Sequence, residues 1–128
     1  MKLAQARLVT SDVPALARFY EELLGVAPIG SEDYVEFRVP GSTLSISSKR
    51  SVDLFNAGAA LPAANHSVIL DFQVQDVDRE RSRLKTLISE FVLEPTNQPW
   101  GNRSMLFRDP DGNLINFFTL IVARRNSN

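Results

Sequence analysis

The chain contains no cysteine among its 128 residues. This absence excludes disulfide bonds, thiolate metal sites and cysteine nucleophiles. Long apolar runs are also missing, because no window approaches the roughly 18 apolar residues that a membrane-spanning helix needs. The first residues, Met1–Arg7, lack the apolar core of a signal peptide. We therefore expect a cytoplasmic protein with no membrane partner.

Runs of basic residues that could follow a phosphate backbone are absent too. The formal net charge is −1 at pH 7, and the pair Arg124–Arg125 near the end reads as two solvated side chains. Nucleic acid is therefore not an expected partner. Hydrophobic residues make up 44% of the chain and charged residues 23%, which is typical of a globular protein. Its length predicts a single domain, residues 1–128.

The first half of the chain carries the pattern β-α-β-β-β. Leu3–Thr10 alternates as a strand does, and Asp12 then has the character of a helix N-cap. Apolar residues follow at helical spacing until Gly25, which is placed to end the helix. Gly30 and the pair Pro40–Gly41 punctuate the next stretch. Three short strands are expected there, at Val26–Ile29, Tyr34–Val39 and Thr43–Ser47.

The second half repeats this order after a connecting loop. Ser51–Asn65 is rich in alanine, glycine and proline and is predicted to link the halves, with a helical turn around Val52–Phe55. Val68–Val74 alternates as a strand, and Asp76 takes the capping place that Asp12 holds in the first half. The core side of the following helix is predicted to comprise Val77, Leu84, Leu87 and Ile88, and a further strand is expected at Phe91–Leu93.

The last stretch predicts a β-hairpin. Its strands are Arg103–Arg108 and Leu114–Leu120, and the turn Asp109–Asn113 holds proline, glycine and asparagine where a tight reversal favours them. The fold class is therefore α+β, with two βαβββ modules at about 1–50 and 66–122 joined by a loop at 51–65.

These elements resemble those of the vicinal-oxygen-chelate superfamily. The resemblance rests on the order of the elements, the helix motif Phe19-Tyr20-x-x-Leu23-Leu24-Gly25 and the closing Asp109-Pro110-Asp111-Gly112-Asn113-Leu114-Ile115. The superfamily includes glyoxalase I, extradiol dioxygenases, and fosfomycin- and bleomycin-resistance proteins. The segment Pro99-Trp100-Gly101-x-Arg103 looks most similar to the small members of the bleomycin-resistance type.

The resemblance implies a curved mixed sheet around a cleft, in which the enzymes of the superfamily bind a divalent metal. The ligand positions fall on Gln5, Ile69 and Asn116, counted from Asp12, Asp76 and the hairpin turn. Two neutral amides and an isoleucine are poor ligands for Mg²⁺, Mn²⁺, Zn²⁺ or Fe²⁺. We therefore expect no metal, no other cofactor and no catalytic residue of the family type.

Other side chains are then candidates for ligand binding. Arg7 and Asp71 occupy corresponding positions in the two first strands, where they are either an anchor for a ligand or an internal ion pair. Trp100 and Phe55 lie in irregular segments and could stack on a flat ligand or pack on their own surroundings. Arg103 could orient an anionic group or end a strand in solvent. The single histidine, His66, reads as a surface residue.

Three functions remain open from the sequence. The first is a metal-free protein that sequesters a flat or amphipathic small molecule, as a homodimer whose two chains line the site. The second is a lyase, isomerase or dioxygenase with an atypical metal site. The third is a structural or regulatory module whose cleft is filled by its own side chains. The residues favour the first of these, with Gln5 and Asn116 joining the candidates named above as ligand-binding residues.

Overall fold

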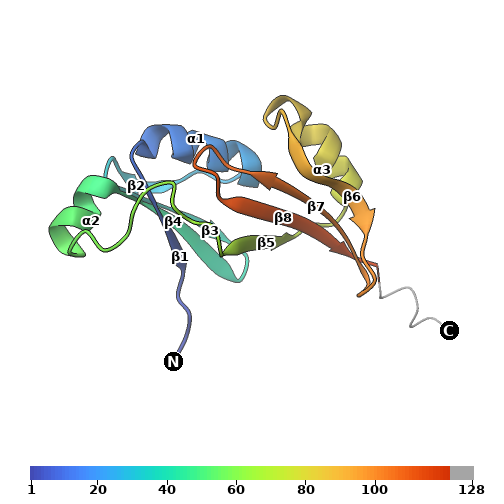
Figure 1. Ribbon diagram of the computed structural model, residues 1–128, viewed down its shortest axis with the longest axis horizontal. Helices are drawn as coiled ribbons and strands as arrows, with labels where there is room; N and C mark the ends of the chain where they lie inside the picture. Colours follow the sequence, from blue (N-terminus) through green and yellow to red (C-terminus); the bar gives the residue numbers. More distant parts are fainter. Residues whose placement is uncertain (122–128) are drawn as a thin grey trace. The chain divides into compact units, whose positions relative to one another are not determined.

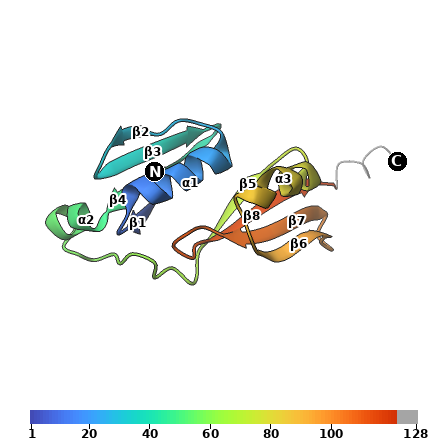
Figure 2. The same cartoon turned by 90° about the horizontal axis from the view of Figure 1, so that it is seen from above.

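The computed structural model describes residues 1–121 (Figures 1 and 2). The chain forms two compact units: unit 1 comprises residues 1–65, and unit 2 begins at residue 66 and is described as far as residue 121. The predicted end of the second module, residue 122, and the pair Arg124–Arg125 lie outside the described residues. No helix within 1–121 is long and apolar enough to cross a membrane.

Unit 1 is a four-stranded sheet with two helices. Its strands run in the order β1-β4-β3-β2 across the sheet, with β1 parallel to β4 and the remaining pairs antiparallel. In chain order the elements are β1 (Ala6–Thr10), α1 (Val13–Leu24), β2 (Ile29–Ser31), β3 (Tyr34–Val39), β4 (Ser42–Ser48) and α2 (Lys49–Phe55).

Local signals set the ends of α1. The Asp12 carboxylate accepts a hydrogen bond from the Ala15 backbone nitrogen at 3.0 Å, and Gly25 ends the helix in the left-handed conformation with φ of 69°. The apolar stripe of the helix is buried, and Tyr20 lies 6.3 Å from Phe37 of β3 between ring centroids. The core of unit 1 thus lies between α1 and one face of its sheet.

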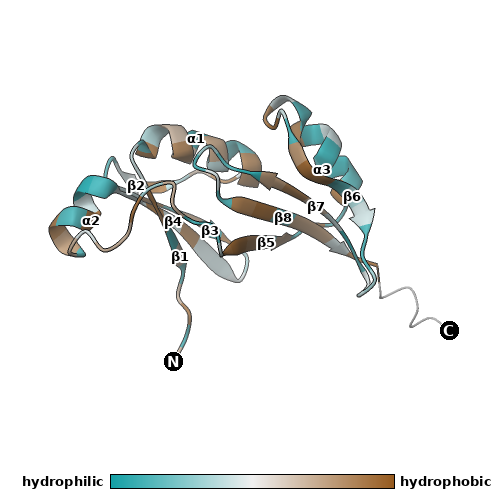
Figure 3. Ribbon diagram, viewed as in Figure 1, coloured by the Kyte–Doolittle hydropathy of each residue, from teal (hydrophilic) through white to brown (hydrophobic). Residues whose placement is uncertain are grey.

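Unit 2 repeats this arrangement with a shorter helix. Its sheet has the order β5-β8-β7-β6, with β5 parallel to β8. In chain order the elements are β5 (Ile69–Gln73), α3 (Val77–Arg83), the 3₁₀ turn η1 (Leu84–Thr86), β6 (Phe91–Asn97), β7 (Asn102–Arg108) and β8 (Leu114–Leu120). Apolar stretches are prominent in β5 and β8 (Figure 3).

The core of unit 2 lies between α3 with η1 and one face of its sheet. The rings of Phe107 and Phe117 meet edge-on with centroids 5.2 Å apart, and both side chains are buried. From the helical side, Val77, Leu84 and Ile88 are buried, as their spacing predicts. The α+β fold and the two βαβββ modules are therefore confirmed.

Several predicted boundaries are wrong by a few residues. The strand expected at Val26–Ile29 is found at Ile29–Ser31, since Pro28 just before it has no N–H to donate to a ladder. The helical turn expected at Val52–Phe55 is a helix from Lys49, because the Ser48 side chain caps it by accepting from the Ser51 backbone nitrogen at 3.0 Å. The strand expected at Phe91–Leu93 extends to Asn97.

Candidate functional site

The sheet of unit 2 has one face covered by α3 and η1 and one opposite them, which we call the helix-free face of unit 2. Successive side chains of a strand point to opposite faces, so the pairing register identifies the residues of each face. Asp71 pairs with Asn116, and Asn116 with Leu106 on its other side. The helix-free face comprises Ile69, Asp71 and Gln73 of β5, Leu114, Asn116 and Phe118 of β8, and Ser104, Leu106 and Arg108 of β7.

A hydrogen bond between two side chains lies at the centre of this face. The Asn116 Nδ2 donates to Asp71 Oδ1 at 2.9 Å. Because a carboxylate only accepts hydrogen bonds, the amide must turn its Nδ2 toward Asp71 and its Oδ1 away. That Oδ1 is shielded from solvent and has no hydrogen-bond partner among residues 1–121. An unsatisfied buried acceptor costs about 1–3 kcal/mol, so this atom calls for an explanation.

The polar pair is surrounded by apolar side chains. Leu106 and Phe118 are half-buried beside Asn116, and Ile69, which precedes Asp71 on the same face of β5, is 50% exposed. A few fixed polar groups within an apolar surface are typical of small-molecule sites. The arrangement can accept donors from a ligand and pack against a flat body.

The face of the unit 1 sheet opposite α1 carries a polar network. The Tyr34 hydroxyl lies 2.9 Å from Glu36 Oε2 and 3.2 Å from Gln5 Oε1. It carries one proton and donates to one of these acceptors at a time. The Tyr34 hydroxyl, and then the Arg38 guanidinium, hold the pKa of Glu36 below its usual range. Since β4 lies between β3 and β1, the contact with Gln5 spans β4, where Ser45 is buried.

Arg7 and Phe55 lie in the same unit. The Arg7 Nη2 donates to Asn56 Oδ1 at 3.0 Å, at the end of α2. The neighbouring Phe55 is 81% exposed. The sequence interpretation overlooked Tyr34 and Glu36, although Val35 and Phe37 alternate with them and could have placed both on the face opposite the core.

The divalent metal that the family resemblance implies does not fit the donor set of this chain. Ile69 has no ligand atom, and the Gln5 oxygen lies against the Tyr34 hydroxyl. Asn116 offers one neutral oxygen, whereas Mg²⁺ and Mn²⁺ prefer carboxylates and Zn²⁺ prefers imidazole or thiolate. Within residues 1–121, no group of three or more histidine, aspartate or glutamate side chains could hold a metal ion.

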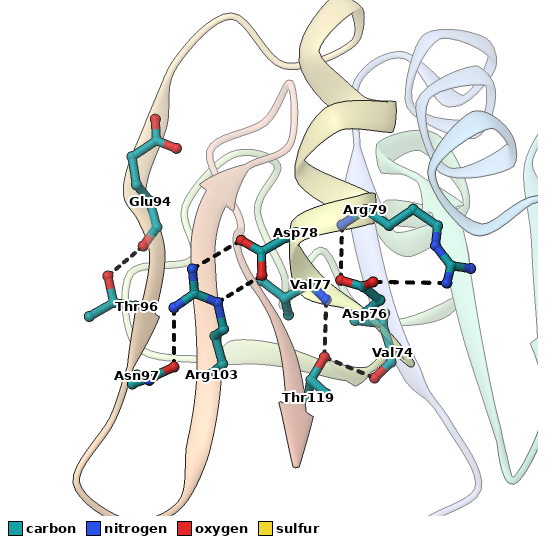
Figure 4. A network of polar contacts seen from close by, with 10 residues as sticks. All are labelled: Val74, Asp76, Val77, Asp78, Arg79, Glu94, Thr96, Asn97, Arg103 and Thr119. Atoms are coloured by element: carbon teal, nitrogen blue, oxygen red, sulfur yellow. Dashed lines mark hydrogen bonds and ion pairs between the residues drawn. The ribbon is translucent and has the colours of Figure 1, made fainter. Parts of the chain in front are cut away.

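The Arg103 side chain lies on the helix-covered face of the unit 2 sheet, whereas that of Asn116 lies on the helix-free face. Its Nε and Nη2 donate to the two carboxylate oxygens of Asp78 at 2.8 and 3.0 Å, and its Nη1 donates to Asn97 Oδ1 at 3.1 Å (Figure 4). The guanidinium holds the pKa of Asp78 below its usual range. This geometry joins α3 to β7, and a ligand role for Arg103 stays a prediction.

Trp100 and His66 both lie on the surface. Trp100 is 68% exposed in the turn between β6 and β7, which the Gly101 N–H closes by donating to the Gln98 carbonyl at 3.1 Å. Such an exposed indole can stack on a flat ligand. His66 is exposed, as the sequence predicts.

Comparisons with known proteins give the same fold. The uncharacterized protein YraH of Bacillus subtilis (strain 168) is 28% identical over an alignment of 128 positions, which covers 94% of this chain and 100% of that protein. A glyoxalase/bleomycin resistance protein/dioxygenase from Nocardioides is 23% identical with a TM-score of 0.78, covering 94% and 84% of the two chains. A family enzyme from Burkholderia phytofirmans PsJN is 15% identical with a TM-score of 0.80, covering 94% and 99%.

These two solved structures share the fold of this chain, and at such identities they show nothing more. The family itself is shown by sequence. The profile of the Glyoxalase/Bleomycin resistance protein/Dioxygenase superfamily matches residues 2–117, which confirms the resemblance drawn from the helix motif and the hairpin turn. The chain therefore belongs to the glyoxalase/bleomycin resistance protein/dioxygenase superfamily.

Proposed function

We propose that this protein binds a flat or amphipathic small molecule without a metal ion and sequesters it rather than converting it. The observation that carries the proposal is the hydrogen bond between Asn116 and Asp71, together with an Asn116 Oδ1 that has no partner among residues 1–121. The family resemblance implies that metal-binding relatives usually have a glutamate at this position, whereas this chain has an amide whose oxygen can accept a hydrogen bond from a bound molecule. Leu106 and Phe118 supply apolar surface next to it.

The other candidate residues have supporting roles in this proposal. Trp100 is exposed and can stack on the flat part of a ligand. Within unit 1, taken by itself, Gln5 and Arg7 offer an amide and a guanidinium group to a ligand, and Phe55 offers an exposed ring. We further propose that two copies of the chain form a homodimer, so that both chains line the ligand sites. Sedimentation analysis measures that state directly.

A titration with a panel of flat aromatic compounds tests the proposal. Binding is followed by calorimetry and by the fluorescence of Trp100, the single tryptophan of the chain. We expect saturable binding by the wild type and at least about tenfold weaker binding by Asn116→Leu, which removes the amide at similar volume. Asn65→Leu, a change of the same kind at another half-buried asparagine, is the control and leaves binding unchanged. Absence of binding by every compound counts against the proposal.

Elemental analysis separates binding from the alternative, a lyase or isomerase with an atypical metal site. The protein is purified without chelators and its content of divalent ions is measured. We expect a ratio far below one ion per chain. A stoichiometric divalent ion that Asn116→Leu removes would overturn the metal-free proposal and favour the enzyme.

A further inference from the structure

Two oxygen atoms at the centre of the helix-free face of unit 2, one of Asp71 and one of Asn116, can accept further hydrogen bonds. Asp71 uses one carboxylate oxygen to accept from Asn116, and its side chain is exposed. Within residues 66–121, no arginine or lysine pairs with this carboxylate, and Oδ1 of Asn116 accepts from no donor. A carboxylate and an amide oxygen on adjacent strands, in direct register, thus have unused capacity to accept hydrogen bonds.

The surroundings leave these acceptors unmatched. Ile69, Leu106 and Phe118 have no polar side-chain atoms. Arg108 shares this face, but its Nη1 donates to the Gly112 carbonyl at 3.0 Å, in the hairpin turn. Gln73 is exposed further along β5 and carries both donors and acceptors. At its centre, the face therefore carries the negative charge of Asp71 and two unused acceptor oxygens, beside the apolar side chains of Ile69, Leu106 and Phe118.

We infer that Asp71 and Asn116 recognise a planar nitrogen cation with several N–H donors, an amidinium or a guanidinium, attached to a flat apolar body. This inference rests on the proposed function and names the chemical class of its ligand. The cation matches the charge of Asp71, and a second N–H satisfies Asn116 Oδ1. A ligand with a carboxylate offers neither the positive charge nor the N–H donor, because a carboxylate is negative and only accepts hydrogen bonds.

Asp71 and Asn116 are a poorer binding site for a metal cation than for an organic cation. One carboxylate and one amide oxygen fall short of the six or more oxygen ligands that Ca²⁺ takes and of the octahedral shell that Mg²⁺ requires. An organic cation needs only two acceptors and gains the apolar contact with Leu106 and Phe118. Asn116 Oδ1 is shielded although the residue is half-buried, so the atoms that shield it must move when the ligand binds.

Three probes with the same ring test the inference on the full chain. Benzamidine carries an amidinium, benzamide a neutral amide with N–H donors, and benzoate a carboxylate. Calorimetry is expected to show benzamidine binding at least about tenfold more tightly than benzamide, and no binding of benzoate. Asp71→Asn, which keeps an acceptor but removes the charge, is expected to weaken benzamidine about tenfold and to leave benzamide unchanged.

Two controls test whether a change in benzamidine binding is specific to Asp71 and whether the variant is folded. Glu21→Gln removes one exposed carboxylate of α1 and is expected to leave benzamidine binding unchanged. Circular dichroism checks that Asp71→Asn is folded. Asn116→Leu is a second variant of the same pair, which removes the amide and leaves the charge of Asp71 in place. Its affinity for benzamidine is expected to fall as well.

The result separates this inference from the proposed function. If benzamide or benzoate binds as tightly as benzamidine, or if neutral aromatic compounds bind and benzamidine does not, the inference is overturned and the proposed function stands. If Mg²⁺ or Zn²⁺ at millimolar concentration displaces benzamidine and binds in an Asp71-dependent way, the site is a metal site and the inference fails. If no compound of the wider panel binds, both fail.

Discussion

Arg103 of β7 donates two hydrogen bonds, of 2.8 and 3.0 Å, to the carboxylate of Asp78 of α3. The helix that it holds is seven residues long and buries only Val77. A helix so short gains little from its own hydrogen bonds and depends on tertiary contacts. A further contact joins it to β8, since the Val77 backbone nitrogen donates to Thr119 Oγ1 at 3.1 Å (Figure 4).

Replacing Arg103 by lysine is expected to destabilise the protein. Lysine keeps the charge but loses the planar fork that matches the carboxylate. Because the pair is largely exposed, the free energy of unfolding is expected to fall by about 0.5–1 kcal/mol. Urea denaturation measures this loss. Arg79→Lys is the control, since Arg79 meets Asp76 only at 3.8 Å. A reduced ligand affinity of Arg103→Lys would support the predicted ligand role of Arg103.

Stability is expected to fall in acid. The pKa values of Asp33, Asp78 and Glu94 are lowered in the folded protein, by the Ser48 hydroxyl and the guanidinium groups that bind them. A lowered folded pKa gives stability that is present above the unfolded value and is lost as the pH falls through the folded value. Unfolded aspartate and glutamate titrate at about 3.9 and 4.3.

The free energy of unfolding is therefore expected to stay level from about pH 7 to 5 and to decline below about pH 4. Urea denaturation across this range measures the profile. Asp78→Asn removes one of the titrating groups and is expected to give a shallower decline. A stability that rises on acidification would contradict this assignment.

Much of the fold could be predicted because its signals are local. The apolar stripe and the caps Asp12 and Gly25 suffice for α1, and turn residues suffice for the final hairpin. The start of β2 and the extent of α2 could not be predicted as well. β2 is a three-residue edge strand whose pairing with β3 is a tertiary choice, and a single capping serine decides where α2 begins.

The candidate site was predictable only in part. Counting from the motifs places Asn116 and Asp71 on the same face, and the register puts them side by side. The partner of Arg103 could not be read from the sequence, because it lies on another element and nothing in the pattern of β7 indicates Asp78. Side-chain pairing between distant segments depends on the packed fold, not on periodicity.

Removing the Tyr34 hydroxyl is expected to raise the pKa of Glu36. The Tyr34 hydroxyl lowers this pKa, and the Arg38 guanidinium lowers it both by its hydrogen bond and by its charge. Tyr34→Phe and Arg38→Met are therefore each expected to raise it. Carboxyl titration by NMR measures both variants. An unchanged pKa of Glu36 in Tyr34→Phe would show that the hydroxyl does not stabilise the carboxylate.

Truncating Asp109 is expected to loosen the final hairpin turn. Its buried carboxylate accepts from the Asp111 backbone nitrogen at 2.9 Å and from the Asn113 backbone and side-chain nitrogens at 2.9 and 2.8 Å. Asp109→Ala leaves these donors unmatched and is expected to cost about 2–3 kcal/mol. The matched change Asp111→Ala is expected not to lower the free energy of unfolding, because it removes a shielded Oδ2 that has no hydrogen-bond partner among residues 1–121. Equal losses in urea denaturation would contradict this account.

Replacing Gly30 by alanine is expected to detach β2 from the sheet of unit 1. A Cβ at Gly30 would lie 2.1 Å from the Tyr34 carbonyl oxygen, so the backbone of β2 or β3 must move. Gly41→Ala is the matched control, since Gly41 also has positive φ, 82°, but a Cβ there meets nothing within 4 Å. Gly41→Ala is therefore expected to lower the free energy of unfolding only by the cost of a positive φ at alanine, about 1 kcal/mol.

Hydrogen exchange separates the two variants. In Gly30→Ala the amides of Ile29–Ser31 are expected to lose their protection, while those of β4 keep it, because β2 is an edge strand whose loss leaves the β1-β4-β3 ladder paired. In Gly41→Ala the protection of β2 is expected to stay as in the wild type. Retained protection of β2 in Gly30→Ala would mean that the strand pair accommodates the methyl group by a shift of its backbone, and that the glycine at this position is not required for pairing.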